Sequence, residues 1–112
     1  MGPLLIVEDE LEIRDLLTEL VSKDGREIVT ASDGQEALER LAEGPRPSLI
    51  LLDLMMPRMD GWEFLQRKSA DSSIAAIPTI VLSGSGRPAS AMHQLTKPVD
   101  VERLRALVDQ YC

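Results

Sequence analysis

The chain has 112 residues, of which 44% are hydrophobic and 28% are charged, and its formal net charge is −7. This composition is typical of a folded globular domain and excludes an intrinsically disordered chain. The negative net charge argues against direct binding to nucleic acid, which requires a basic face. The length predicts a single domain over residues 1–112.

The cysteine usage is consistent with a reducing compartment without proving it, and the hydropathy pattern shows no membrane or targeting segment. Cys112 is the only cysteine, so no disulfide can form within the chain. No apolar run approaches the length of a membrane span, and the N-terminus lacks the pattern of a signal peptide. We therefore expect a cytoplasmic protein that makes no membrane contact.

The first half of the chain alternates short apolar runs with segments whose apolar residues recur at helical spacing. The run Leu49–Leu52 is bounded by Pro47 and Pro57 and is too short for a typical helix, so we expect a strand buried on both faces. The elements predicted in this half are a strand over 4–7, a helix from 11 to about 24, a strand over 27–31, a helix over 35–42 and a strand over 49–52.

The second half continues this alternation, and its last helix has a clear start signal. Asp100 is a good N-cap, and an apolar stripe at helical spacing follows it. The elements predicted here are a helix over 62–70, a strand over 77–82, a short strand over 93–96 and a closing helix after Asp100. Strands that alternate with helices predict a parallel sheet covered by helices, with right-handed crossovers.

Polar residues stand where four of the predicted strands end. They are Glu8 and Asp9 after the first strand, Asp53 at the end of the third, Ser83 after the fourth, and Lys97 after the last. The carboxyl ends of parallel strands meet at one edge of the sheet, where such sheets bind ligands. Taken alone, Asp53 could equally start a turn and Asp9 could cap a helix. Their convergence favours a functional site.

These groups suit phosphoryl transfer. Three carboxylates at one edge repel each other, and a cation among them relieves the repulsion. Oxygen ligands without His or Cys suit a hard ion, for which Mg²⁺ is the first choice. Two carboxylates can hold the metal while one attacks phosphorus. The Lys97 ammonium, the Ser83 hydroxyl and the Gly84 amide can bind the oxygens of a phosphoryl group.

Four segments, in this order, resemble the successive signatures of response-regulator receiver domains, and the resemblance covers essentially the whole chain. The segments are LLIVEDE, LLDLMMPRMDG, PTIVLSGSG and LTKP. The resemblance implies a three-layer, doubly wound α/β fold of the flavodoxin-like type, with five parallel strands in the order 2-1-3-4-5. It also implies a phosphorylation-dependent switch of a two-component system.

The resemblance assigns roles to individual residues. It implies that Asp53 accepts a phosphoryl group from the phosphohistidine of a sensor histidine kinase or a phosphotransfer protein. It implies that Ser83 and Lys97 contact that group. The only catalysis it implies is the Mg²⁺-dependent phosphorylation and dephosphorylation of the domain itself. The implied Mg²⁺ ligands are Asp9, Asp53, the backbone carbonyl of Met55 and, mostly through water, Glu8.

Two features depart from the family pattern. The segment between Ser83 and Lys97 is about eight residues shorter than usual, roughly two helical turns, so we expect the fourth helix to be short or absent. Gln94 stands where the family usually has Tyr or Phe. His93 beside it is a candidate phosphate relay, although a lone His on a short strand is more often a surface or packing residue.

The shortened segment is expected to expose apolar area near Leu82 and Leu95. Either a partner or a second copy in a homodimer covers this area, or Met92 and its neighbours fold over it. The interpretation as a whole is a stand-alone receiver domain whose output partner is unknown. The alternative is a degenerate receiver that serves as a constitutive protein-interaction module.

Overall fold

The computed structural model describes residues 2–53, 61–83, 93–96 and 99–112, with the backbone alone for Ser83 and Thr96. Its strands are β1 (Leu4–Val7), β2 (Ile28–Ala31), β3 (Leu49–Asp53), β4 (Thr79–Ser83) and β5 (His93–Thr96). Its helices are α1 (Leu11–Val21), α2 (Gly34–Glu43), α3 (Gly61–Ala70) and α4 (Val101–Tyr111).

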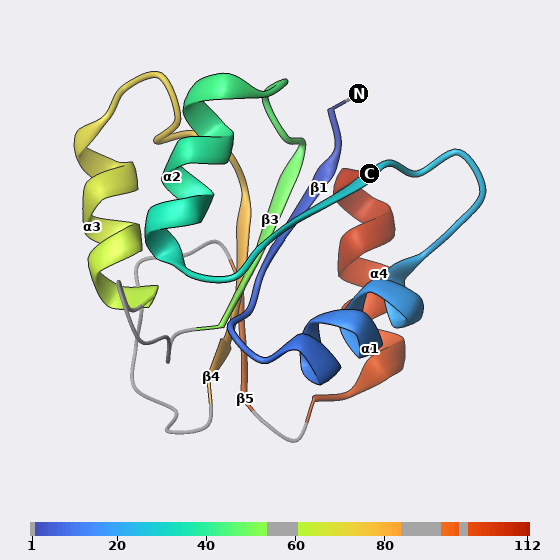
Figure 1. Ribbon diagram of the computed structural model, residues 1–112. Helices are drawn as coiled ribbons and strands as arrows, with labels where there is room; N and C mark the ends of the chain where they lie inside the picture. Colours follow the sequence, from blue (N-terminus) through green and yellow to red (C-terminus); the bar gives the residue numbers. More distant parts are fainter. Residues whose placement is uncertain (1, 54–60, 84–92, 97–98) are drawn as a thin grey trace.

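The strands form one parallel sheet in the order β2-β1-β3-β4-β5. Helices α2 and α3 cover one face of this sheet, and α1 and α4 cover the other (Figure 1). The predicted three-layer α/β fold and strand order are therefore confirmed. The predicted shortening of a fourth helix falls on residues 84–92, which lie outside the described residues, as does Met92.

Alternate residues of each central strand enter two separate cores, because successive side chains of a strand point to opposite faces. Leu5, Ile50 and Val81 pack under α2 and α3 with the fully buried Phe64. Their neighbours along the strands pack under α1 and α4. Burial on both faces explains why β1 and β3 are continuous apolar runs.

The expected exposure of apolar area near Leu82 and Leu95 is wrong. Leu82 is 2% exposed and Leu95 is 6% exposed, and both pack with Leu104 and Val108 of α4. The physical reason is the strand alternation, which turns both leucines toward α4. A shortened segment between β4 and β5 therefore leaves these two side chains covered.

Side-chain capping sets the start of two helices but not of the first. The Oδ1 atom of Asp33 accepts from the Glu36 amide at 2.8 Å before α2, and Asp100 Oδ1 accepts from the Arg103 amide at 3.2 Å before α4. The N-cap of α1 is Glu10, and it makes no side-chain capping bond. The alternative that Asp9 caps this helix is therefore wrong.

Two element boundaries differ from the predicted ones by two residues or more. Helix α1 ends at Val21 rather than near Asp24, because Ser22 is already extended and the chain then turns through Gly25, whose φ is +82°. Strand β4 begins at Thr79 rather than at residue 77, because the Ile77 amide is bonded back to the carbonyl of Ile74 at 3.2 Å.

Candidate functional site

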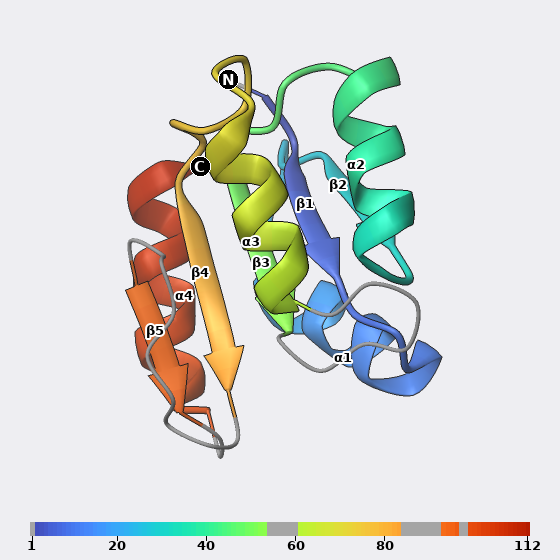
Figure 2. The ribbon, with the colours of Figure 1, turned by 90° about the vertical axis from the view of Figure 1, so that its left-hand side faces the viewer.

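The register between β1 and β3 places the acids at the ends of these two strands beside each other. Val7 of β1 pairs with Leu52 of β3, and the next residues along the two strands are Glu8 and Asp53. The strands end together at one edge of the sheet (Figure 2). The loop from β1 to α1 is only three residues long, 8–10, so Asp9 is held at the same edge.

The three predicted acids form a cluster, here called the acid cluster (Glu8, Asp9 and Asp53). One carboxylate oxygen from each lies within 4.8 Å of the others. Glu8 is 1% exposed and Asp53 is 6% exposed, whereas Asp9 is more accessible. Three carboxylates this close, two of them buried, are strongly unfavourable when all are ionised.

At this position the ionised form of Glu8 is unfavourable. Burial, followed by the hydrogen bond and the charge of the adjacent Asp53 carboxylate, raises the pKa of Glu8 from 4.5 to about 8. Its Oε1 atom accepts from the Glu10 amide at 3.2 Å. Its Oε2 atom is buried and has no hydrogen-bond partner within the described part of the chain.

This cluster fits a hard divalent cation. A buried carboxylate oxygen without a partner, beside two further carboxylates, has the charge and the free lone pairs that such an ion binds. The candidate ligand atoms are all oxygens, which suits Mg²⁺ better than a softer metal. The chemistry of these residues is therefore compatible with bound Mg²⁺.

The remaining predicted site residues are described only in part. The backbone of Ser83 ends β4 and pairs with Thr96, one position beyond the pair formed by Asp53 and Leu82. Ser83 thus reaches the same edge as the acid cluster on the neighbouring strand. The Ser83 side chain and the predicted residues Met55, Gly84 and Lys97 lie outside the described residues.

His93 lies away from the acid cluster. It begins β5, at the opposite end of the strand from Thr96, and its Nε2 atom is 3.0 Å from the hydroxyl oxygen of Tyr111. The two rings are tilted, with centroids 5.8 Å apart. This geometry agrees with a packing role for His93. Gln94 is half-buried on the same strand.

One residue at the site was not predicted from the sequence. Arg14, in the first turns of α1, donates from Nη1 to the backbone carbonyl oxygen of Glu8 at 3.0 Å. The available signal was that Arg14 is the first basic residue of the chain and follows the acidic run Glu8–Glu10.

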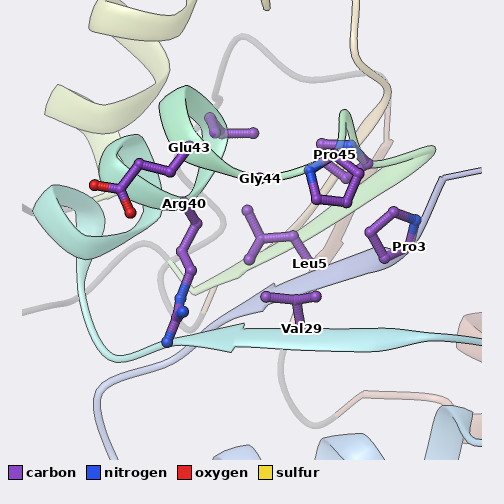
Figure 3. Close-up of a pocket in the computed structure, with 9 residues that line it drawn as sticks. Pro3, Leu5, Val29, Arg40, Glu43, Gly44 and Pro45 are labelled. Atoms are coloured by element: carbon purple, nitrogen blue, oxygen red, sulfur yellow. The ribbon is translucent and has the colours of Figure 1, made fainter.

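The cavities that the described residues border lie away from the acid cluster. One of about 270 Å³ is bordered by Leu5, Val29 and Arg40, among others, at the amino-terminal end of the strands (Figure 3). The acid cluster is at the carboxyl end, so this cavity takes no part in its chemistry. Among the described residues, no helix combines the length and apolar character needed to cross a bilayer.

Comparison with known proteins identifies the family. The model of the response regulator receiver domain matches residues 4–109. Sporulation initiation phosphotransferase F of Bacillus subtilis is 34% identical over 96% of the chain and 91% of its own length. The DNA-binding dual master transcriptional regulator RpaA of Synechocystis is 35% identical over 96% of the chain, which spans only 48% of that regulator.

Solved structures agree with the sequence matches. The chemotaxis protein CheY4 of Vibrio cholerae superposes with a TM-score of 0.85 and 28% identity, over 100% of this chain and 99% of that one. The fold, the family model and the sequence relatives point the same way, toward homologues of response regulators, which is consistent with phosphorylation-dependent two-component signalling. The chain belongs to the response-regulator receiver domain family.

Proposed function

We propose that Asp53 accepts a phosphoryl group from the phosphohistidine of a sensor histidine kinase or a phosphotransfer protein. The observation that carries this proposal is the acid cluster: Asp53 is 6% exposed at the end of a buried strand and lies within 4.8 Å of two further acids. A carboxylate in this setting is a competent nucleophile once its neighbours are neutralised.

In this proposal Glu8, Asp9, Asp53 and the backbone carbonyl of Met55 hold Mg²⁺, with Glu8 acting mostly through water. The ion supplies positive charge against the acids and against the phosphoryl oxygens. The unpartnered Oε2 atom of Glu8 supports this assignment, because a buried carboxylate oxygen is costly without a partner. The sequence relatives show the family of the chain, whereas the set of Mg²⁺ ligands is part of our proposal.

The transfer itself requires little covalent chemistry from the protein. A carboxylate oxygen of Asp53 attacks phosphorus, the phosphorus–nitrogen bond of the donor breaks, and the imidazole leaves with the bonding electron pair. The Ser83 hydroxyl, the Gly84 amide and the Lys97 ammonium stabilise the oxygens of the transferred group. Attack of water on the same phosphorus later returns Asp53 to a carboxylate. The domain thus acts on itself and turns over no other substrate.

The phosphoryl group would act as a switch by drawing Ser83 toward it and altering the surface at the end of β4. Ser83 is adjacent to Asp53 through the pairing of β3 with β4, which supports a short path for this movement. We further propose that residues 1–112 form one receiver domain, that it acts in the cytoplasm, and that it delivers its signal to a protein rather than to nucleic acid.

Gln94 favours a second candidate, a degenerate receiver that binds a partner constitutively. It replaces the aromatic ring that the family usually has at this position of β5. The two functions differ in whether phosphorylation occurs and changes the structure.

The decisive experiment is to incubate the protein with Mg²⁺ and acetyl phosphate and to measure its intact mass. We expect a gain of one phosphoryl group in the wild type and none in Asp53→Asn. Asp71→Asn, which removes a carboxylate from the connection between α3 and the start of β4, at the opposite edge of the sheet, should still gain the group. No gain in the wild type would contradict the proposal, and a gain in Asp53→Asn would contradict the site. Unchanged Trp62 fluorescence after a confirmed gain would favour the degenerate receiver.

A further inference from the structure

Two of the three members of the acid cluster stand on a connection that has little to hold it in place. The segment 8–10 joins β1 to α1, and neither the sheet ladder nor the helix includes it. Its helix start, Glu10, has no side-chain cap. The Glu10 amide donates to Glu8 Oε1 at 3.2 Å, but this bond lies within the segment and does not attach it to the rest of the fold. Something else must therefore fix the direction of these two side chains.

Arg14 provides that restraint. The amide of Glu8 donates to the carbonyl of Ala31 on β2 at 3.0 Å, and the carbonyl of Glu8 accepts from Arg14 Nη1 at 3.0 Å. Both backbone groups of Glu8 are thus bonded, one to the sheet and one to α1. The amide of Arg14 also donates to the Glu10 carbonyl at 2.8 Å, so the same residue holds both ends of the connection.

The charge of Arg14 cannot explain its presence beside a metal site. A guanidinium group near the cluster repels a divalent cation, so its charge alone would weaken Mg²⁺ binding. A hydrogen bond from that group to a backbone carbonyl has the opposite effect, because it holds two ligands in the geometry that the ion needs. Mg²⁺ demands near-ideal octahedral coordination, which makes its binding sensitive to small displacements of a ligand.

We propose that Arg14 is a positioning residue for the acid cluster, which it serves by bonding the Glu8 carbonyl and so aiming the Glu8 and Asp9 carboxylates at the cation site. The inference rests on the proposed function, because it takes the acid cluster to be a Mg²⁺ site. Arg14 touches neither the ion nor the phosphoryl group in this role.

The test is the Mg²⁺ affinity of the whole chain, measured by isothermal titration calorimetry for the wild type, Arg14→Gln and Arg14→Lys. Loss of one hydrogen bond to a backbone carbonyl corresponds to about a 3- to 10-fold rise in the dissociation constant of Arg14→Gln. Arg14→Lys keeps the charge and one donor, so we expect an intermediate value. If Arg14 acted through charge alone, Arg14→Gln would bind Mg²⁺ more tightly and Arg14→Lys would equal the wild type.

Arg40→Gln is the matched control. Arg40 also donates from its guanidinium to a strand carbonyl, that of Thr30 at 3.2 Å, but it lies on α2, and its acidic partner is Glu36 rather than a member of the acid cluster. We expect its Mg²⁺ affinity to equal that of the wild type. An equal or tighter affinity in Arg14→Gln would overturn the inference, and if that variant fails to fold, a wild-type affinity in Arg14→Lys would do the same. Absence of Mg²⁺ binding in the wild type would instead refute the proposed metal site.

Discussion

The two faces of the sheet are joined to their helices in different ways. On the α1/α4 face, arginines connect segments that are far apart in the chain. Arg26 donates from Nη1 to the Val21 carbonyl at 2.6 Å and from Nη2 to Asp109 Oδ1 at 2.6 Å. Arg105 of α4 donates to the Leu20 carbonyl at 2.8 Å. Because the last carbonyls of a helix have no partner within it, these bonds both end α1 and attach it to α4.

On the α2/α3 face, two cavities border α2. A cavity of about 510 Å³ lies between α2 and α3, and the cavity of about 270 Å³ lies between α2 and the start of β1 and β2 (Figure 3). Leu41 borders both. Apart from Gly34, only Ala37 of α2 is fully buried, so the helix is anchored to the sheet mainly through small or half-buried side chains.

The difference shows that α2 is attached to the sheet more loosely than α1 and α4 are, whereas α3, on the same face as α2, buries Phe64 and Leu65. Close-packed regions resist displacement, whereas regions with few buried contacts open at lower cost. A structural change that starts at the acid cluster would therefore be accommodated more easily by α2 than by α1 or α4. Replacements matched between the two faces can test this contrast.

The largest expected effect is a leucine truncation on each face. Leu104 of α4 is fully buried, so Leu104→Ala should lower the free energy of unfolding by about 3–4 kcal/mol. Leu41 is half-buried and already borders cavities, so Leu41→Ala should cost about 1 kcal/mol. Urea unfolding of both variants measures the difference. Equal losses would contradict the contrast between the faces.

The next effect concerns the acid cluster, at the edge that both faces share. The pKa of Glu8 is about 8 in the folded state against 4.5 as its ordinary value, so the folded state keeps a proton that the unfolded chain has lost. Without Mg²⁺, the free energy of unfolding should therefore fall as the pH rises from about 5 to about 8. Thermal unfolding across this range should show the fall, and saturating Mg²⁺ should reduce it.

Glu8→Gln is the control for this pH dependence. It removes the titrating group and keeps a side chain of similar shape, so the slope between pH 5 and pH 8 should flatten, to within about 1 kcal/mol of a level line. This substitution alters no residue of the two hydrophobic cores on the faces of the sheet. A wild-type profile as flat as that of Glu8→Gln would show that the cluster holds no proton in this range.

A smaller effect is expected from the arginines. The side chain of Arg26 is 7% exposed and makes two hydrogen bonds, so Arg26→Met should lower the free energy of unfolding by about 2 kcal/mol. Arg40 is half exposed, and its ion pair with Glu36 spans 3.7 Å on the surface, so Arg40→Met should cost about 0.5 kcal/mol. Denaturant unfolding compares the two. A larger loss of stability for Arg40→Met than for Arg26→Met would contradict the stronger attachment of α1 and α4.

The features of this structure that short stretches of sequence determine could be predicted from the sequence. Continuous apolar runs identify buried strands, and the residues that end Leu4–Val7 and Leu49–Asp53 identify the acid cluster, because parallel strands bring those ends together. The receiver resemblance supplied the strand order, which the structure confirms.

The features that sequence reasoning missed depend on three-dimensional proximity. The covering of Leu82 and Leu95 depends on which face each residue of an edge strand points to, and α4 provides that cover from a later part of the chain. The bond between Arg26 and Asp109 joins residues 83 positions apart, and no local pattern indicates it. His93 meets Tyr111 for the same reason.

The smallest expected effect compares an acid bonded to a residue distant in the sequence with an acid bonded to a near neighbour. The hydrogen bond from Arg26 lowers the pKa of Asp109 on the α1/α4 face, and the hydrogen bond from the Ser73 hydroxyl lowers the pKa of Asp71 on the α2/α3 side. A lowered folded pKa contributes stability that is present above the ordinary value of 3.8 and is lost as the pH falls through the folded pKa. A contribution of this kind should therefore be present at neutral pH and disappear in acid, provided that the bond forms only in the folded state.

The two acids should nevertheless differ in size of effect. Arg26 is near Asp109 only in the folded state, whereas Ser73 is two residues from Asp71 and can form its bonds in the unfolded chain as well. Asp109→Asn should therefore destabilise the protein at neutral pH and converge with the wild type in acid, while Asp71→Asn should change little at either pH. Urea unfolding at both pH values measures this. If Asp71→Asn gave the larger pH-dependent loss, local turn bonds would stabilise the fold more than the connection between α1 and α4.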